Sequence, residues 1–179
     1  MDMKKHAVYP GTFDPLTLGH LDLIERSAKI FSRLTVAVAA TSVKNGAMFD
    51  VDERVAMVRE ACAEAGVANV DVRPLDCLLV DFCHRYDPVP VVVRGLRVYS
   101  DFEYEFQMAL TNRKLSPDVE TLFMMPQEEY SYVTASMVRE IARYAGDVSP
   151  FVPSAVMPHV RAYVERLAAA KRGDGKARR

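Results

Sequence analysis

Short apolar runs alternate along the chain with longer segments in which apolar residues recur every three or four positions. The runs lie at residues 7–9, 34–40, 70–72, 89–93 and 119–125. The second run is continuous and rich in valine, which is typical of a strand that is buried in a parallel sheet. Because strand and helix alternate almost throughout, the pattern predicts an α/β fold: a doubly wound, Rossmann-like sheet of five parallel strands with helices on both faces.

The helical segments carry their own start signals. Asp50 and Glu53 have the spacing of a capping box, and so do Ser100 and Glu103. In the helix that Ser100 would open, the apolar side chains expected to face the core are Phe102, Phe106, Ala109 and Leu110. Further helices are expected at residues 21–31, 79–86, 134–144 and from 154 onwards.

Composition and charge narrow the class of function. The chain has 179 residues, half of them hydrophobic, and a formal net charge of -1. We expect one domain over residues 1–170 and a basic, disordered tail at 171–179. The balanced charge indicates neither nucleic acid nor membrane as a partner. Three cysteines without C-x-x-C spacing, and no apolar stretch suited to a signal peptide or a bilayer span, favour a soluble cytoplasmic protein.

The candidate chemistry lies in the loops that follow the strands, because ligands of such sheets bind beyond the carboxyl ends of the strands. The first loop belongs to the stretch Y-P-G-T-F-D-P-L-T-L-G-H, residues 9–20. Its glycine lets the backbone approach a ligand, and His20 at a helix start could donate a hydrogen bond to a phosphate. Spacing alone supports a phosphate seat and a rigid turn with a histidine cap equally, since the loop lacks the lysine of a Walker A motif.

The segment R-G-L-R after the fourth strand places two arginines at the same edge of the sheet. Arg94 and Arg97 favour an anion site, because guanidinium groups at a buried edge need an anion or a carboxylate beside them. The alternative is a set of salt bridges to nearby acids: Asp101, Glu103 or Glu105.

Other loops add weaker signals. Ser131, Thr134 and Ser136 precede a helix and favour a second anion-binding helix start, because an ordinary N-cap would explain only one hydroxyl. Tyr130 and Tyr132 could pack on a base or cover the core. Lys44, after the second strand, is by itself more typical of a solvated lysine.

Several of these motifs together resemble a known family. T-L-G-H after Y-P-G-T-F-D-P resembles the (H/T)-x-G-H signature of the nucleotidylyltransferase superfamily. R-G-L-R, D-F-E-Y-E and T-A-S-M-V-R are similar to motifs of the phosphopantetheine adenylyltransferase family, in the same order from about residue 5 to 153. The resemblance implies transfer of AMP from ATP to 4′-phosphopantetheine, giving dephospho-coenzyme A and pyrophosphate, in the penultimate step of coenzyme A biosynthesis. It also implies Mg²⁺ as cofactor, a homohexamer built as a dimer of trimers, and coenzyme A as a candidate feedback inhibitor.

The resemblance also implies roles for individual residues. His20 would bind the α-phosphate and stabilise the transition state, and Thr12 would lie between the two substrates. The acceptor would be bound by Thr12, Lys44, Leu79 and Arg94. ATP would be bound by Thr12, Phe13, His20, Gly95, Leu96, Arg97, Glu105, Tyr130, Ser131, Tyr132, Val133, Thr134, Ala135 and Ser136. No residue is assigned to the metal, since magnesium would be held mainly by phosphate oxygens.

The chain departs from the family pattern at three places. Thr134-Ala135-Ser136 stands where three serines are usual, Tyr130 stands where tryptophan is frequent, and the loop of Lys44 differs slightly in length. The rival interpretations are another small-molecule nucleotidylyltransferase, for example one that accepts nicotinate mononucleotide, an aminoacyl-tRNA synthetase, and a nucleotide-binding regulator without turnover. A phosphate monoester is largely dianionic at neutral pH and needs no general base, which fits a chain without a convincing catalytic triad.

Overall fold

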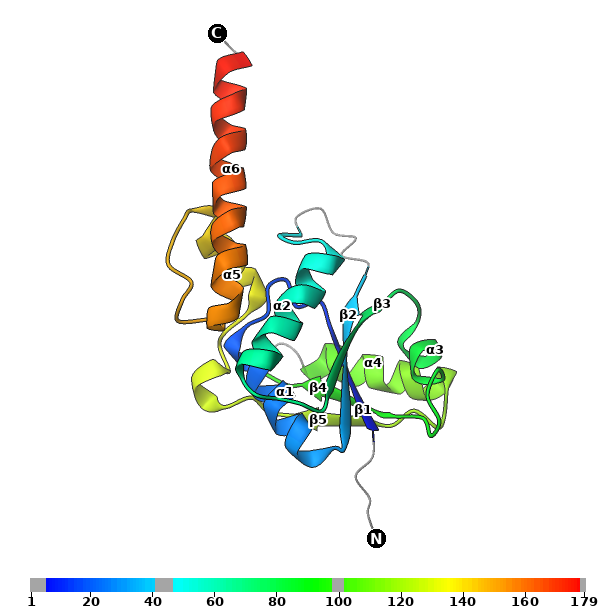
Figure 1. Ribbon diagram of the computed structural model, residues 1–179. Coiled ribbons are helices and arrows are strands. Elements are labelled where there is room, and N and C mark those ends of the chain that lie inside the picture. Colours follow the sequence, from blue (N-terminus) through cyan, green and yellow to red (C-terminus); the bar gives the residue numbers. More distant parts are fainter. Residues whose placement is uncertain (1–5, 41–46, 98–101, 178–179) are drawn as a thin grey trace.

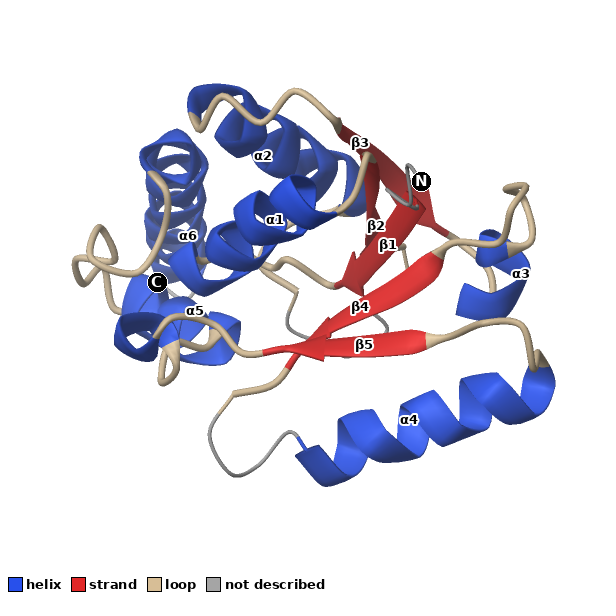
Figure 2. Ribbon diagram, turned by 90° about the horizontal axis from the view of Figure 1, so that it is seen from below, coloured by secondary structure: helices blue, strands red, loops and turns tan. Residues whose placement is uncertain are grey.

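A sheet of five parallel strands, in the order β3-β2-β1-β4-β5, forms the centre of the computed structural model (Figures 1 and 2). The structure describes residues 6–40, 47–97 and 102–177, with side chains up to residue 170. The strands are β1 (His6–Gly11), β2 (Arg33–Ala39), β3 (Val70–Leu75), β4 (Val91–Gly95) and β5 (Thr121–Met124). This arrangement confirms the predicted five-stranded, Rossmann-like fold.

Six α-helices and two short 3-10 helices connect or follow the strands in the described residues. The α-helices are α1 (Leu18–Ile30), α2 (Val51–Glu64), α3 (Leu79–Cys83), α4 (Phe102–Leu115), α5 (Ala135–Arg143) and α6 (Met157–Ala177). The 3-10 helices are η1 (Glu128–Tyr130) and η2 (Ser154–Val156). The capping box predicted at Asp50 is confirmed, because Asp50 Oδ1 accepts from the Glu53 amide at 2.8 Å while Glu53 Oε2 accepts from the Asp50 amide at 3.1 Å. Ser100, predicted to open α4, lies outside the described residues.

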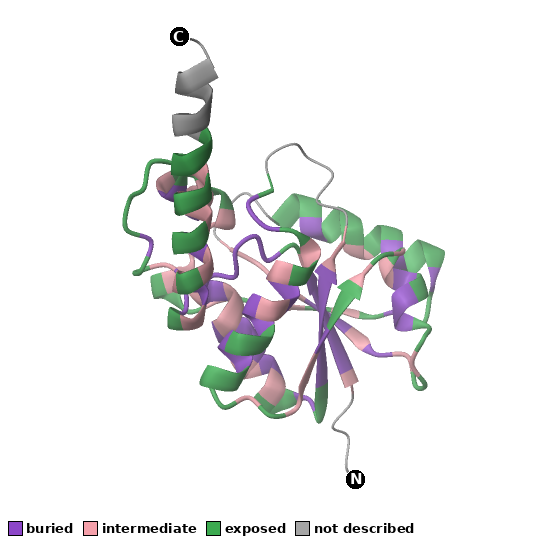
Figure 3. Ribbon diagram, turned by 45° about the horizontal axis from the view of Figure 1, so that its top comes forward, coloured by how far each residue is buried: buried purple, intermediate pink, exposed green. Residues whose placement is uncertain are grey.

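The helices lie in two layers, with α1 and α2 over one face of the sheet and α3 and α4 over the other (Figure 2). Successive side chains of a strand point to opposite faces, so β1 contributes to two separate cores. Ala7 and Tyr9 pack in the larger core, under α1 and α2, whereas Val8 packs with Phe82 of α3 in the smaller one. Burial on both faces explains why β1 and β2 are apolar without alternation, and Figure 3 shows both strands as buried.

The exposed side of α4 corrects one prediction. Phe102, Phe106 and Leu110 were expected to face the core, but they are 53%, 46% and 50% exposed. The buried residues of α4 are the polar Glu105 and Asn112. The physical reason is that the inner side of α4 lines a pocket, described below, so that most of the helix is exposed (Figure 3).

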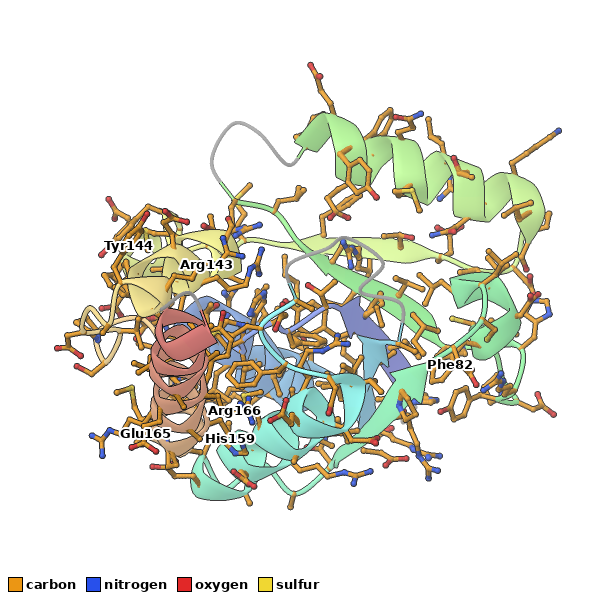
Figure 4. The ribbon with its side chains drawn as sticks, turned by 90° about the horizontal axis from the view of Figure 1, so that it is seen from above. Phe82, Arg143, Tyr144, His159, Glu165 and Arg166 are labelled. Atoms are coloured by element: carbon orange, nitrogen blue, oxygen red, sulfur yellow. The ribbon has the colours of Figure 1, made fainter. Side chains whose placement is uncertain are left out.

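Helix α6 extends away from the sheet but is attached to α2 along its first turns (Figure 1). His159 and Arg166 lie on the side of α6 that is nearer to α2 (Figure 4). His159 Nε2 is 2.8 Å from Glu60 Oε2, and Arg166 Nη1 donates to Glu53 Oε1 at 2.9 Å. The helix continues to Ala177, so its backbone is helical in most of the segment for which a disordered tail was predicted.

Candidate active site

Two adjoining pockets lie at the carboxyl ends of β1 and β4, where the strand order reverses and where ligands of doubly wound sheets bind. Pocket A encloses about 620 Å³ of space, including its open mouth, and lies between the start of α1, the end of β4 and the loop before α5. Pocket B encloses about 910 Å³, again including its open mouth. It lies between the ends of β2 and β3, α3 and the inner side of α4. The two pockets share four lining residues: Pro10, Gly11, Thr12 and Arg94.

The turn after β1 is built so that Thr12 reaches the boundary between the pockets. A Cβ atom added to Gly11 would lie 2.8 Å from the ring of Phe13, so only glycine fits there without a shift. Phe13 adopts a positive φ of 48° and is fully buried, with its ring edge-to-face against Tyr9 and His20. Because the Phe13 side chain lies in the core, a ligand could meet this residue only through its main chain.

His20 is both a helix cap and a lining residue of pocket A. It is the third residue of α1, and the Thr17 hydroxyl accepts a hydrogen bond from its amide. In return, the Thr17 amide donates to His20 Nδ1 at 3.1 Å. Nδ1 is therefore an acceptor, which places the ring proton of a neutral imidazole on Nε2. The two interpretations of His20 from sequence, a cap and a group facing a ligand, are thus compatible.

The electrostatic surroundings keep His20 neutral. Burial is the main cause, and the positive charges of Arg97 and Arg94 add to it; together they lower the pKa of His20 to about 3. A neutral imidazole whose Nδ1 is occupied can donate from Nε2 without changing its charge. Tyr9, also at pocket A, is uncharged for a similar reason, since burial raises its pKa to about 12.

Arg94 is paired with a carboxylate. Its Nε donates to Glu105 Oε2 at 2.6 Å, its Nη2 donates to Glu105 Oε1, and its Nη1 donates to the Pro10 carbonyl. Among the acids that the sequence offered as partners of Arg94, Glu105 is the one that pairs with it. Burial lowers the pKa of the guanidinium, but the bonds to Glu105 outweigh this effect and the pKa is raised overall.

The loops around pocket A are held together by close contacts. Gly19 lets η1 approach α1, since a Cβ atom there would lie 3.3 Å from Tyr130 Cβ. Arg97 Nη1 donates to the Val133 carbonyl at 3.2 Å and so joins the loop after β4 to the loop before α5. At Gly95, an added Cβ atom would lie 2.5 Å from Leu23 Cδ1.

The predicted ATP-binding set is only partly gathered around pocket A. The residues of that set that line it are Thr12, His20, Gly95, Arg97, Tyr130 and Val133. Glu105 lines pocket B instead, with the predicted acceptor residues Thr12, Leu79 and Arg94. Leu96, Ser131, Tyr132, Thr134, Ala135 and Ser136 lie near pocket A in the chain but are not among its lining residues. Lys44 lies outside the described residues.

The start of α5 beside pocket A is capped by a hydroxyl. Thr134 is the N-cap, and its Oγ1 accepts from the Met137 amide at 3.1 Å and lies 3.0 Å from Ser136 Oγ. Two of the three hydroxyls singled out from sequence are therefore engaged with each other. The amides of Ala135 and Ser136 belong to the first turn, where amides have no partner within the helix.

Two buried polar residues near the pockets were not singled out from sequence. Arg54, in α2, donates to the main-chain carbonyl of Thr12, and Asp22, in α1, accepts from the Gln127 amide at 3.0 Å. The one signal for Arg54 was its place on the apolar face of α2, three and four residues before Met57 and Val58. A buried charge of this kind needs a specific set of partners.

Neither a protein metal cluster nor a membrane span is found in the described part of the chain. Within residues 6–40, 47–97 and 102–177, no group of three or more His, Cys, Asp or Glu side chains could hold a metal ion. Over the same ranges, the helices are too short or too polar to cross a membrane.

Comparison with known proteins gives consistent results. The family model described as cytidylyltransferase-like matches residues 8–141. A protein of Methylococcus capsulatus named phosphopantetheine adenylyltransferase is 51% identical over 92% of this chain and 96% of its own length. One of Thiobacillus denitrificans with the same name is 53% identical over 82% of this chain and 89% of its own.

The solved structures with a similar fold are more distant in sequence. A candidate nicotinate-nucleotide adenylyltransferase of Vibrio parahaemolyticus has a TM-score of 0.70 at 18% identity, covering 92% of this chain and 96% of that one. A bifunctional NMN adenylyltransferase/ADP ribose pyrophosphatase of Francisella tularensis has a TM-score of 0.70 at 13% identity, covering 93% of this chain and 52% of that one. These likenesses concern the fold, whereas the sequence matches identify the family. The chain belongs to the cytidylyltransferase-like family and, within it, to the phosphopantetheine adenylyltransferases.

Proposed function

We propose that this protein transfers the adenylyl group of ATP to 4′-phosphopantetheine, giving dephospho-coenzyme A and pyrophosphate. The observation that carries the proposal is the pair of pockets that meet at Thr12, in a chain about half identical to two phosphopantetheine adenylyltransferases. A transfer between two bound substrates needs two sites with a common boundary, and Thr12 and Arg94 lie at that boundary.

The chemistry of the linings supports an assignment of each substrate. Pocket A includes the start of α1, His20 and Arg97, and a helix N-terminus with nearby donors suits a polyphosphate. Pocket B is lined by apolar side chains, among them Leu75, Leu79 and Met108, which suits the long uncharged chain of pantetheine. ATP is therefore assigned to pocket A and the acceptor to pocket B.

The reaction then requires placement more than proton transfer. An oxygen of the acceptor phosphate forms a bond to the α-phosphorus of ATP, and the bond from that phosphorus to the bridging oxygen of pyrophosphate breaks. The acceptor is already largely dianionic at neutral pH, so no general base is needed. His20 would donate from Nε2 to an oxygen of the α-phosphate, where charge changes during the transfer. Before the substrates bind, the pKa of His20 is far below neutral, so the imidazole is neutral with its proton on Nε2.

The remaining binding roles follow from the family resemblance. Arg94 and Lys44 would bind the phosphate of the acceptor, and Arg97 would bind ATP. Since the Arg94 guanidinium is engaged by Glu105, the acceptor phosphate would have to replace this carboxylate or share its donors. Magnesium would be held mainly by phosphate oxygens and water. The metal would supply charge neutralisation on the phosphates.

We extend the proposal to assembly and regulation. The exposed apolar side chains of α4, Phe102, Phe106 and Leu110, support contact between copies, because monomers seldom expose such groups together. A homohexamer built as a dimer of trimers, located in the cytoplasm, is the assembly that the family resemblance favours. Coenzyme A contains the pantetheine chain and would compete for pocket B. Light scattering of the purified protein, with and without Phe106→Glu, tests the assembly.

The function itself is tested by ATP-dependent release of pyrophosphate. We expect release with 4′-phosphopantetheine and magnesium, and none when dephosphorylated pantetheine replaces it. Nicotinate mononucleotide serves as the competing acceptor, and release with it alone would overturn the proposal in favour of another nucleotidylyltransferase. The control is His20→Ala, for which we expect kcat to fall by about 100- to 1,000-fold, the usual effect of losing one preorganised donor.

A further inference from the structure

A buried arginine connects the turn after β1 to the end of β2. Arg54, in the first turn of α2, is 1% exposed. Its Nη1 donates to the carbonyl oxygens of Thr12 at 2.8 Å and Ala39 at 2.9 Å. Its Nε donates to the carbonyl oxygens of Phe49 at 3.2 Å and Asp50 at 3.0 Å. One side chain therefore joins four main-chain groups from three segments.

Asp14 makes the complementary set of bonds. It is buried, and its carboxylate accepts from the Met48 amide at 3.0 Å and from the Phe49 amide at 3.0 Å. Arg54 thus donates to carbonyl groups, and Asp14 accepts from amides. Both side chains connect the turn around Thr12 to the residues just before α2. This turn is fixed from two directions.

Buried charged side chains such as Arg54 and Asp14 are a costly way to stabilise a fold. Removing a guanidinium from water carries a large desolvation penalty, and packed apolar side chains of similar volume often stabilise as well or better. The hydrogen bonds of Arg54 and Asp14 can also matter for the reaction, because they fix the turn of Thr12, which lies where pocket A meets pocket B. In-line transfer needs reacting atoms about 3–3.5 Å apart, and a misplacement of about 1 Å can cost about 100-fold in rate.

We propose that Arg54 is a positioning residue for adenylyl transfer: by holding the main chain of Thr12, it keeps the acceptor phosphate in line with the α-phosphorus of ATP. Arg54 does not line either pocket, so it acts through Thr12 and touches no substrate. The inference rests on the proposed function. It assigns to Arg54 an effect on turnover with both substrates bound, and none on the binding of either substrate alone.

The helix offers a control of the same residue type at an exposed position. Arg59 also lies on α2 and donates from Nη2 to a main-chain carbonyl, that of Val72 at 2.8 Å. Val72 is in β3, and neither residue lines a pocket. Arg54→Met and Arg59→Met therefore remove the same chemical group from the same helix, and only the first should affect the turn at Thr12. Arg54→Lys keeps a positive charge but cannot reach four carbonyl groups with the geometry of a guanidinium.

The experiment measures the dissociation constants of ATP and of the acceptor separately by calorimetry, the folded fraction by circular dichroism, and kcat per folded molecule. For Arg54→Met we expect kcat per folded molecule to fall by about 30-fold or more while each dissociation constant stays within about threefold. Arg59→Met should stay within about threefold in kcat per folded molecule and in both dissociation constants, and kcat of Arg54→Lys should lie between those of Arg54→Met and the wild type. If Arg54→Met does not fold, Arg54→Lys decides, with an expected fall in kcat of about tenfold.

Two outcomes would overturn the inference. One is normal kcat per folded molecule in the folded Arg54 variants, and the other is an equal loss in Arg59→Met. Failure of the proposed function is a separate result, because it would appear as missing turnover of the wild-type protein with 4′-phosphopantetheine. The Arg54 comparison would then be made with whichever acceptor the wild type uses.

Discussion

The half-buried, neutral His20 should make the stability of the protein depend on pH in a way that one substitution removes. The substitution is His20→Gln, because Thr-x-x-Gln is itself a capping box, and the new glutamine side chain can keep the reciprocal bond with Thr17 at the start of α1. Glutamine does not titrate. Any difference in pH dependence between the variant and the wild type therefore reports the protonation of His20.

The magnitude follows from the two pKa values. His20 has a pKa of 6.5 when unfolded and about 3 when folded. The unfolded state therefore binds more protons, and stability that is present above pH 6.5 is lost as the pH falls toward 3. Between pH 7 and pH 5 the loss comes to about 2 kcal/mol. Because one edge of the imidazole reaches pocket A, solvent offsets part of the burial effect, and we expect roughly 1–2 kcal/mol.

Urea unfolding at pH 7 and pH 5 measures this difference. The free energy of unfolding of the wild type should fall between these pH values by about 1–2 kcal/mol more than that of His20→Gln. Both proteins share the other three histidines, so their titration cancels in the comparison. Parallel curves, with a difference below about 0.5 kcal/mol, would refute the argument that burial keeps His20 neutral.

Three further substitutions test other parts of the site. Glu105→Gln removes the carboxylate that pairs with Arg94. Calorimetry should therefore show tighter binding of 4′-phosphopantetheine, and the free energy of unfolding should fall by about 2–3 kcal/mol. Weaker binding would mean that Glu105 chiefly orients the guanidinium. Ala135→Ser should change KM for ATP by less than about threefold, because the first-turn amides of α5 are present in both proteins, and a tenfold decrease would contradict this. Gly95→Ala should lower the free energy of unfolding by about 1–3 kcal/mol, because the added methyl group would contact Leu23. In a double-mutant cycle, Leu23→Val should restore about 1 kcal/mol of this stability. Additive losses would show that this contact is not the cause.

The sequence predicts the fold well because its apolar pattern is strong where strands are buried on both faces. The runs at β1, β2 and β4 have no other simple interpretation, and the capping box at Asp50 adds a local signal. The prediction for α4 was wrong because periodicity identifies an apolar side of a helix but not what that side faces. Here the inner side lines pocket B, and the apolar side chains around Phe106 lie outside.

The site could be predicted in its parts but not in its pairings. The first loop and the arginines were found from residue type and position, and the structure brings Thr12, His20, Arg94 and Arg97 to the same edge of the sheet. Which carboxylate pairs with Arg94 depends on how α4 lies against β4, which no local pattern specifies. Arg54 was missed because a single charge on an apolar helix face hardly changes the periodicity.

The boundary that the two pockets share has a consequence for the end of the catalytic cycle. Dephospho-coenzyme A contains both the adenylyl group and the pantetheine chain, so on the proposed assignment of ATP to pocket A and the acceptor to pocket B the product would occupy both pockets at once. A molecule that joins two binding groups engages the second at a high effective concentration, on the order of millimolar for short links, and so binds more tightly than either part. Pyrophosphate leaves early under this scheme, whereas the adenylylated product leaves late and can limit turnover. On the same assignment, the enzyme that consumes dephospho-coenzyme A would affect turnover, since rapid removal of this product would free both pockets together.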